Sequence, residues 1–323
     1  MAGILDIRYS ELRFTVRMVQ ASRLPRFKAS AIRGGMGDML LNEYCVREQI
    51  RKENDNKCDL CDYLDECIVQ RILYSKLDIV PAFMSSGNSV GYIVECLDIR
   101  EEFEAGESFQ FKLILFGKNC YYLSQYLSMI YRLGITGLGR DAAQFEVISV
   151  RNMRNEEILS GNDIYKERYR IDKISDYVSW RKGKLKEAGA SDQLHIRYKT
   201  PIAIKKNGEF QKELKIEDLI DNLNRRVYSL NCFEGSEYKE LLEKQISYPV
   251  MTGSENNIIY IPRYSFRKEQ KIFLEGIYGY MDIDISVLPD KDELISRLLA
   301  GEVLHIGSNT SFGFGGYELE IND

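Results

Sequence analysis

Residues 304–321 read LHIGSNTSFGFGGYELEI, and this segment is the most informative part of the sequence for predicting the fold. Before it, residues 290–300 carry an apolar stripe at helical spacing behind a D-x-x-E capping pattern. Gly301 is expected to end this helix as a left-handed cap. Four more glycines follow within ten residues, and residues 317–321 alternate apolar and acidic side chains as a strand does. The chain is therefore predicted to end as helix, glycine-rich loop and strand.

The same order occurs once earlier in the chain. Residues 123–131 carry a helical stripe, a glycine-rich loop follows, and residues 145–150 (FEVISV) indicate a strand. Each unit follows a strand, a helix and a hairpin, which completes the β-α-β-β-α-β order of a ferredoxin-like domain. The sequence predicts an α+β fold of tandem ferredoxin-like (RRM-like) domains at residues 1–155 and 191–323, joined by a basic connector at 156–190.

One glycine cluster complicates the first domain. Gly34, Gly35 and Gly37 lie at the start of the helical segment 29–44. Because glycine is the commonest residue of turns, this start is expected to be a turn or loop.

Composition limits the class of protein. The chain has 323 residues, enough for two domains, with 44% hydrophobic and 29% charged residues. No apolar run approaches the roughly 20 residues of a membrane span, and charges appear too early for a secretory signal, so a cytoplasmic protein is expected. The formal net charge of −5 argues against a surface coated in basic groups, although a local groove can be basic. Residues 166–186 are the most basic segment and contain Trp180, and they are either a solvated connector or an RNA contact.

Four of the seven cysteines fall within 23 residues, spaced C-x12-C-x2-C-x5-C. In a cytoplasmic chain, clustered cysteines bind metal more often than they form disulfides. Four thiolates complete a tetrahedral site, and with no histidine nearby the site would be closed and structural. A zinc-binding insert is predicted at residues 45–67, and free thiols, a disulfide or an iron–sulfur cluster are the alternatives. The predicted ligands are Cys45, Cys58, Cys61 and Cys67.

The two glycine-rich loops are candidate binding elements. Glycine lets backbone N–H groups approach a phosphate, and nearby Arg, Ser and Asn side chains add donors. Neither loop is a P-loop or a dinucleotide fingerprint, since no G-K-[ST] follows and a strand rather than a helix comes next. A tight turn beside a strand is the alternative for each. The candidates are Gly137, Gly139 and Arg140 in the first loop, and Gly307, Ser308, Asn309, Gly313 and Gly315 in the second.

A basic segment, RYSFR, precedes a strand at residues 263–267. Its side chains would pair phosphates and stack a base, or would cap a hairpin. Arg263, Ser265 and Arg267 are the candidates here. The two histidines, His195 and His305, lie in strand patterns, where a hydrogen-bonded structural role competes with a functional one.

Several motifs together resemble a known family. They are IRGGMGDML at 32–40, LFG at 115–117, GLGRDAAQFEV at 137–147, PRYSFR at 262–267, LEGIYGY at 274–280 and HIGSNTSFGFGGYEL at 305–319. In this order they resemble the CRISPR-associated repeat-cleaving endoribonucleases, RAMP-superfamily proteins that cut precursor CRISPR RNA within each repeat. The resemblance spans nearly the whole chain and is most specific in the last motif. It implies two RRM-like domains with RNA held in the cleft between them.

The resemblance also implies metal-independent cleavage, in which a 2′-hydroxyl attacks the adjacent phosphate and leaves a cyclic phosphate and a 5′-hydroxyl. Such chemistry needs a general base, a general acid and a cation beside the phosphorane. The family often supplies a histidine in or near the first helix, with tyrosine or lysine helpers, but this chain has Asp38 there. The remaining catalytic candidates are Lys28, Arg33, Tyr44 and Lys52 on the first helix and its flanks, and His305 at the second glycine-rich loop.

Two other functions compete with this endoribonuclease. One is a non-catalytic RAMP subunit that coats guide RNA within a CRISPR effector complex, and the other is a zinc-stabilised protein-interaction module without RNA. The expected partners are CRISPR repeat RNA or crRNA and such an effector complex, without a membrane; a homodimer is an open alternative. A structural zinc ion is the expected cofactor, with no catalytic metal.

Overall fold

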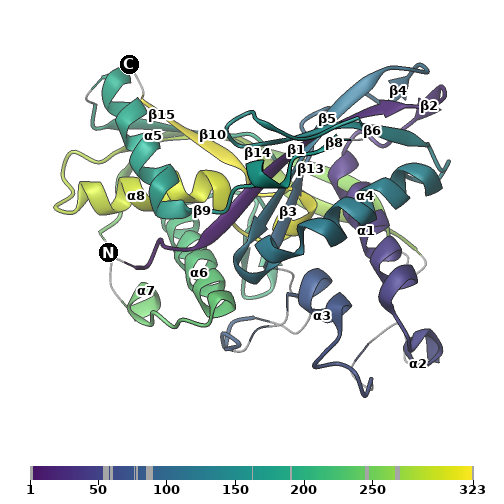
Figure 1. Ribbon diagram of the computed structural model, residues 1–323. Coiled ribbons are helices and arrows are strands. Elements are labelled where there is room, and N and C mark those ends of the chain that lie inside the picture. Colours follow the sequence, from purple (N-terminus) through teal and green to yellow (C-terminus); the bar gives the residue numbers. More distant parts are fainter. Residues whose placement is uncertain are drawn as a thin grey trace.

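The computed structural model describes residues 3–53, 58, 61–75, 77, 79–84, 90–161, 163–189, 191–243, 247–265 and 270–321. Two main β-sheets, one in each half of the chain, form the centre of this part of the molecule (Figure 1). Helices α1 and α4 lie together at one end, and α5, α6 and α8 lie at the other. The two sheets have the same strand order, as the repeated sequence pattern predicts.

The first sheet has the ferredoxin-like arrangement. Its strands run in the order β3-β5-β1-β6, and β7 and β8 extend it beyond β6. Leu12, Phe14 and Val16 alternate along β1 as predicted and are fully buried, and Phe14 stacks on Phe111 with ring centroids 4.9 Å apart. The elements of this half are β1 Arg8–Met18, β2 Ser22–Arg23, α1 Lys28–Tyr44, α2 Glu48–Glu53, α3 Ile68–Leu73, β3 Tyr92–Glu95, β4 Glu102–Phe103, β5 Ser108–Phe116, η1 Gly117–Tyr122, α4 Leu123–Thr136 and β6 Phe145–Asn152.

The prediction of a turn at the start of the first helix is wrong. Helix α1 runs without interruption through Gly34, Gly35 and Gly37. A Cβ atom at Gly35 would overlap the buried side chain of Leu133 on α4. Glycine at this position therefore permits the close contact of two helices rather than a turn.

The second sheet repeats the order as β13-β14-β10-β15. Asn207 and Gly208 have φ angles of 54° and 85° and join β11 to β12, which confirms the predicted hairpin turn. The elements are β10 Gln193–Tyr198, β11 Lys205–Lys206, β12 Glu209–Phe210, α6 Ile216–Glu234, α7 Glu240–Glu243, β13 Val250–Ser265, β14 Gln270–Asp284, α8 Lys291–Leu304, η3 Thr310–Phe312 and β15 Tyr317–Ile321.

Helix α8 does not end at Gly301 as expected. It continues to Leu304, and the residue with the positive φ angle is His305, at 54°. A Cβ atom at Gly301 would overlap the hydroxyl group of Tyr317, which donates a hydrogen bond to the Leu298 carbonyl at 2.6 Å. Because Gly301 has no side chain, the buried Tyr317 can pack directly against the helix at this position.

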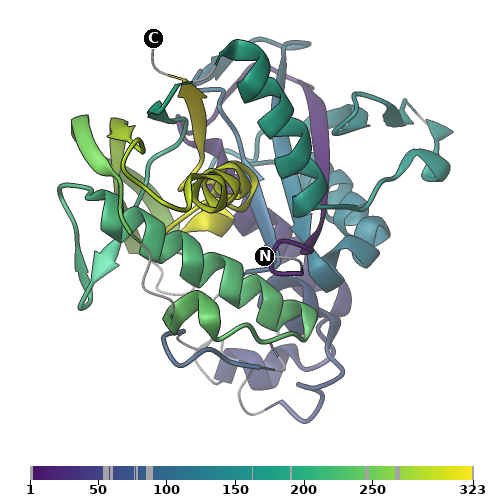
Figure 2. The same cartoon turned by 90° about the vertical axis from the view of Figure 1, so that its left-hand side faces the viewer.

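The segment expected to be a basic connector is structured. It contains β7 Glu157–Ser160, β8 Asp163–Ile164, η2 Lys166–Arg168, β9 Asp172–Lys173 and α5 Ile174–Ala188. Strand β9 pairs with the start of β1, and α5 packs against α8, which Figure 2 shows nearly end-on.

Much of the positive charge of this segment is neutralised within the protein. Arg181 pairs with Glu302 at 3.1 Å, Lys182 with Asp292 at 2.7 Å and Lys173 with Asp6 at 2.8 Å. Arg181 and Lys182 join α5 to α8, and Lys173 joins β9 to the N-terminal segment. They offer little free charge to an RNA backbone.

One of the buried hydrophobic clusters spans both halves of the chain, and another lies within the first half alone. Ile93, Ile114 and Phe116 of the first sheet belong to the same buried cluster as Leu223 and Phe233 of α6. At the edge of this cluster the Arg8 Nε atom donates a hydrogen bond to Glu234 at 3.0 Å. None of the helices in the described ranges has the length and apolar character needed to cross a bilayer.

Candidate nucleic-acid interface

The second glycine-rich loop, residues 305–316, is seated on the first domain. Its short helix η3 packs against β3 and the start of α1. Gly313 has a φ angle of 83°, and a Cβ atom there would overlap the Val94 carbonyl and lie 3.2 Å from Ala29 Cβ. Only glycine fits this contact, so Gly313 acts in domain docking.

Several backbone groups of this loop are already engaged inside the protein. The amides of Gly313 and Gly315 donate to the carbonyls of Thr310 and Pro201, both at 2.8 Å. The Ser308 amide donates to the Ala203 carbonyl at 2.6 Å. These amides are therefore not available to a phosphate in this conformation.

The other loop candidates shape the turn. A Cβ atom at Gly307 would overlap the Ala203 carbonyl, and both Gly307 and Asn309 have positive φ angles, of 80° and 64°. The side chains of Ser308 and Asn309 are half-buried. These two are the polar side chains of the predicted loop set that solvent reaches.

His305 joins the two domains from a buried position. Its Nδ1 atom lies 2.8 Å from the Phe314 carbonyl, and its Nε2 atom lies 3.4 Å from a carboxylate oxygen of Glu95 on β3. The side chains of His305 and Glu95 are 1% and 4% exposed. An RNA strand cannot reach His305 while the loop is docked.

Lys112 completes this buried ion cluster, with its Nζ atom 3.3 Å from Glu95. Burial alone would raise the pKa of Glu95. His305 and Lys112 outweigh that effect and hold the pKa well below its usual range, with a smaller contribution from Lys199. The carboxylate thus remains charged and holds the glycine-rich loop against β3.

Two arginines from different domains meet at Phe312. The Arg33 guanidinium of α1 lies 4.9 Å from the Phe312 ring centroid, and the Arg263 guanidinium of β13 lies 4.3 Å from it. The Nε atom of each arginine is buried without a hydrogen-bond partner among the described residues. Burial, followed by the charge of Arg33, lowers the pKa of Arg263.

Neither guanidinium has a carboxylate within 4.0 Å in the part of the chain that the structure describes. Two partly desolvated cations beside an aromatic ring are suited to an anionic ligand that also stacks. Arg33, Arg263 and Phe312 are named the arginine cluster below. Phe312 was not among the predicted site residues.

Lys28 is held inside the first domain. It is fully buried, and its Nζ atom donates to the carbonyls of Asp98, at 2.9 Å, and of Arg100. Burial lowers its pKa. The amine is therefore a structural donor and is not accessible to an RNA phosphate in this conformation.

The remaining candidates on the first helix do not converge. A helix rises about 1.5 Å per residue, so Lys28 and Tyr44 lie about 24 Å apart along α1. Tyr44 lines the cavity of the cysteine insert, and Lys52 on α2 pairs with Glu48 at 2.7 Å. Of the four first-helix candidates, only Arg33 belongs to the arginine cluster.

Asp38 lies on α1 beyond Arg33. Burial raises its pKa, and the charges of Arg33 and Arg51 partly offset that shift. The carboxyl group is therefore within electrostatic range of the arginine cluster.

The first glycine-rich loop is not seated on the second domain in the same way. Gly137 caps α4 with a φ angle of 98°, and Leu138 and Ala143 form a β-bridge across the turn. Gly139, with a φ angle of 78°, lies near Pro25, and Arg140 is exposed. Ser265 ends β13, but its side chain and the whole of Arg267 lie outside the described residues.

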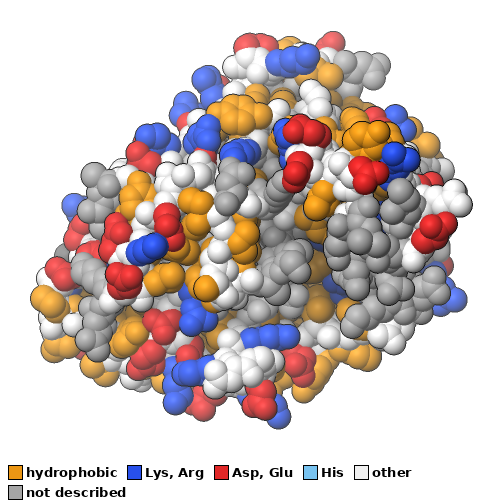
Figure 3. All heavy atoms as spheres, turned by 90° about the horizontal axis from the view of Figure 1, so that it is seen from below, with side chains coloured by type: hydrophobic (Ala, Val, Ile, Leu, Met, Phe, Trp, Pro, Cys, Tyr) orange, Lys and Arg blue, Asp and Glu red, His pale blue; other side chains and the backbone are white. Residues whose placement is uncertain are grey.

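Outside the arginine cluster, one face of the molecule carries both basic and acidic side chains. On the described part of the face seen from below, basic and acidic side chains intermingle and form no continuous basic surface (Figure 3). The other histidine, His195, bonds through Nδ1 to Asp282 at 2.6 Å, in agreement with a structural role in its strand.

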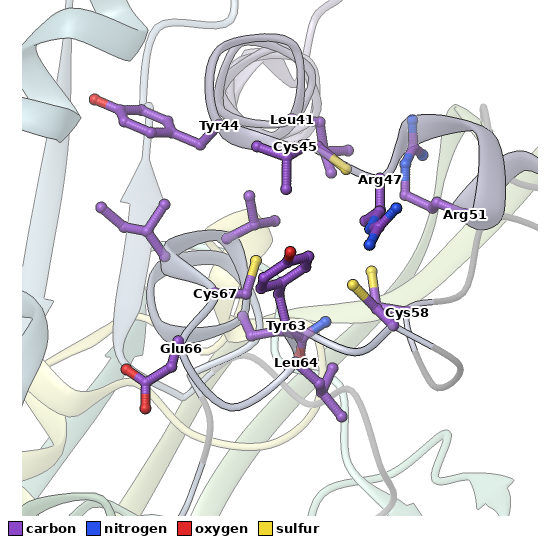
Figure 4. A pocket seen from close by; sticks show the side chains of 15 residues that line it. Leu41, Tyr44, Cys45, Arg47, Arg51, Cys58, Tyr63, Leu64, Glu66 and Cys67 are labelled. Carbon is purple, nitrogen blue, oxygen red and sulfur yellow. The ribbon is translucent and has the colours of Figure 1, made fainter.

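The four clustered cysteines line one cavity of about 260 Å³. Cys45, Cys58 and Cys67 direct their sulfur atoms toward it (Figure 4). Burial raises the pKa of Cys58, and the neighbouring thiols of Cys45 and Cys67 raise it further. Among the described residues, however, no three Cys, His, Asp or Glu side chains converge closely enough to hold a metal ion, so the zinc insert remains a prediction.

The fold and this site define a class: two-domain proteins built from tandem ferredoxin-like units. Two family models match the chain, an N-terminal domain family named AF_1859_N over residues 7–175 and the CRISPR-associated endoribonuclease Cas6 family over residues 196–317. The first model covers just over half of the chain, which therefore belongs to the AF_1859_N family, and the match of residues 196–317 to the Cas6 family confirms the resemblance stated from the motifs.

Among solved structures that are similar at low sequence identity, one with a TM-score above 0.5 shows the same fold. A chain of a partial Cas6-RT-Cas1–Cas2 complex matches 99% of this chain at 12% identity with a TM-score of 0.59, and 47% of that chain is covered. This chain thus spans about half the length of that relative. A Cas6 product complex matches 97% of this chain and 99% of its own at 14% identity and a TM-score of 0.49. Thermus thermophilus Cas6 gives 13% identity, coverages of 97% and 98%, and a TM-score of 0.49. No curated protein sequence matched.

Proposed function

We propose that this chain binds precursor CRISPR RNA and cleaves it within the repeat without a catalytic metal. In this reaction a 2′-hydroxyl attacks the adjacent phosphate, and the products are a cyclic phosphate and a 5′-hydroxyl. The match of residues 196–317 to the Cas6 family supports the substrate class.

The single observation that carries the proposal is the arginine cluster. Arg33 and Arg263 have no described carboxylate within 4.0 Å, and both lie against Phe312. Guanidinium groups bind phosphate oxygens in charge-assisted pairs, and an aromatic ring stacks with an unpaired base. The two cations would also stabilise the charge that develops on the phosphorane.

Proton transfer cannot rely on an accessible histidine here, because His305 is buried and His195 is bonded to Asp282. Asp38 is the replacement proposed here, since its raised pKa suits proton exchange better than that of an ordinary carboxylate does. Asp38→Asn removes this group without a large change in volume. It is expected to slow cleavage and leave RNA affinity unchanged.

The first test uses labelled repeat RNA with and without a 2′-deoxy substitution at the cleavage position. Each RNA is incubated with the protein in EDTA and, separately, in zinc. The expected result is one cut in both buffers that the deoxy substitution abolishes. A cut that survives the deoxy substitution would exclude the proposed chemistry.

Variants of the arginine cluster link this activity to the structure. Arg33→Ala and Arg263→Ala are each expected to weaken RNA binding on the order of tenfold, since a hydrogen bond to a charged group contributes about 1.5–3 kcal/mol. Arg132→Ala is the matched control, because Arg132 is exposed and already pairs with Glu43 at 3.0 Å. Equal RNA affinity of all three variants would place the RNA elsewhere.

The second candidate function is an RNA-binding subunit that does not cut. The burial of Lys28 and His305 and the wide spacing along α1 favour it, because none of these groups is placed for proton transfer at the arginine cluster. It predicts RNA binding that depends on Arg33 and Arg263 without product in any lane. An effector complex, or a partner equivalent to the rest of the longer relatives, would then supply the activity.

A further inference from the structure

The insert between α1 and α3 has almost no apolar core of its own. From residue 41 to residue 68, no described side chain is buried, whereas Leu40 before it and Val69 after it are. Its one described helix, α2, has six residues. A segment of this kind usually needs a cross-link or a metal ion to hold one conformation.

All four cysteines of the insert line a single cavity, although they come from three places in the chain. Cys45 directly follows α1 and donates its amide to Leu41 at 2.9 Å. Cys67 directly precedes α3. Cys58 and Cys61 share a turn closed by a hydrogen bond from the Cys61 amide to the Cys58 carbonyl at 3.0 Å. The cavity of about 260 Å³ that they share has room for an ion with its ligands (Figure 4).

The charges around the cavity suit a thiolate-bound cation. Four thiolates on a divalent ion leave a net charge of about −2, and Arg47 and Arg51 line the same cavity. Of the nearby carboxylates, Asp62 is 76% exposed, and Glu66 lines the cavity with a side chain that is 84% exposed. An all-sulfur donor set is soft and closed, which favours zinc in a structural role.

We propose that Cys45, Cys58, Cys61 and Cys67 bind one structural zinc ion that fixes the insert and the C-terminal end of α1. In the present conformation no three of the described Cys, His, Asp or Glu side chains lie close enough together to hold a metal ion. Zinc binding therefore requires the four sulfur atoms to move closer together. The site is independent of RNA binding at the arginine cluster.

The test measures metal content in protein purified under reducing conditions from a zinc-supplemented culture. Elemental analysis is expected to give one zinc per chain in the wild type. The Cys58→Ser, Cys61→Ser double variant is expected to lose it. Cys96→Ser is the control, because Cys96 lies outside the cavity and contacts the Gln110 carbonyl at 3.4 Å.

A second measurement covers the case in which the double variant does not fold. Chelation of zinc from the wild type is expected to open residues 41–68 to limited proteolysis, and added zinc is expected to restore protection. Wild-type protein without zinc, a brown chromophore with iron and sulfide, or a disulfide in place of free thiols would each overturn the proposal. Since Arg33→Ala should retain zinc, a failure of the RNA-binding proposal is distinguishable from a failure of this one.

Discussion

Arg33 and Arg263 show how a binding residue differs from a stabilising one. Each guanidinium is partly buried, and neither has a carboxylate partner in the described part of the chain. Removing a cation from water destabilises the folded state unless a counter-charge compensates. We therefore infer that the two side chains serve to bind a ligand, although their uncompensated charges lower the stability of the folded protein.

Arg263→Met tests this at the residue scale. Methionine keeps an apolar side chain against Phe312 but removes the charge, so the free energy of unfolding should be unchanged or raised by about 1 kcal/mol. RNA affinity should fall, and the dependence of log affinity on log salt should become shallower by about one. Urea unfolding and binding titrations at several salt concentrations measure the two effects. A loss of stability equal to the loss of affinity would contradict a ligand-binding role.

Glu95 provides a pH-dependent contribution to stability. Its pKa is lowered in the folded state, so its stabilising effect is fully present above the unfolded pKa, about 4.3, and is lost as the pH falls through the lower folded value. Glu95→Gln should destabilise the protein by about 3 kcal/mol at neutral pH, because it leaves Lys112 without its buried partner.

The pH profile separates this role from simple packing. Between about pH 5 and pH 2, wild-type stability should fall more steeply than that of Glu95→Gln. Urea unfolding at each pH gives both curves. Parallel curves would show that the charge of Glu95 has no part in holding the loop.

At the scale of elements, the sequence pattern predicts most of the fold. It does not predict correctly why glycine occupies some helical positions. The helix–loop–strand repeat and both ferredoxin-like strand orders follow from periodicity, which is a local property. Gly35 and Gly301 are required by contacts with Leu133 and Tyr317, which are distant in sequence. Local sequence patterns contain no information about contacts between residues that are distant in sequence.

Adjacent glycines of α1 make a direct test. A Cβ atom at Gly34 would have no neighbouring heavy atom within 4 Å, so Gly34→Ala should stabilise the protein by about 0.5–1 kcal/mol through helix propensity. Gly35→Ala forces Leu133 to move and should destabilise it by about 1–3 kcal/mol. Thermal unfolding of the pair measures the difference, and equal effects would contradict the observed α1–α4 packing.

The candidate site was predictable only in part for the same reason. Arg33 and Arg263 are among the sequence candidates because Arg33 lies on the first helix and Arg263 lies in the basic segment 263–267. Phe312 lay inside the quoted C-terminal motif, but its position between two arginines depends on how the domains dock. Lys28 and His305 were predicted as catalytic candidates because the sequence alone does not show that their side chains are buried.

At the scale of the whole molecule, the two domains share one buried cluster, so they should unfold together. Phe233 of α6 is 2% exposed, and Cβ atoms built at Gly91 and Gly117 of the first domain would approach its ring within 3.0 Å. Calorimetry should show one transition whose calorimetric and van't Hoff enthalpies agree. Phe233→Ala should lower stability by about 3–5 kcal/mol. Two separate wild-type transitions would show that the domains are energetically independent.

The origin of Arg33 and Arg263 in separate domains has a thermodynamic consequence. A ligand held by both guanidinium groups binds only to the docked arrangement, so its binding free energy adds to the free energy of docking. Repeat RNA would therefore act as a conformational clamp, raising the melting temperature as its concentration rises. The same RNA would leave the melting temperature of a variant without either arginine almost unchanged, which makes thermal shift a readout of occupancy that needs no cleavage.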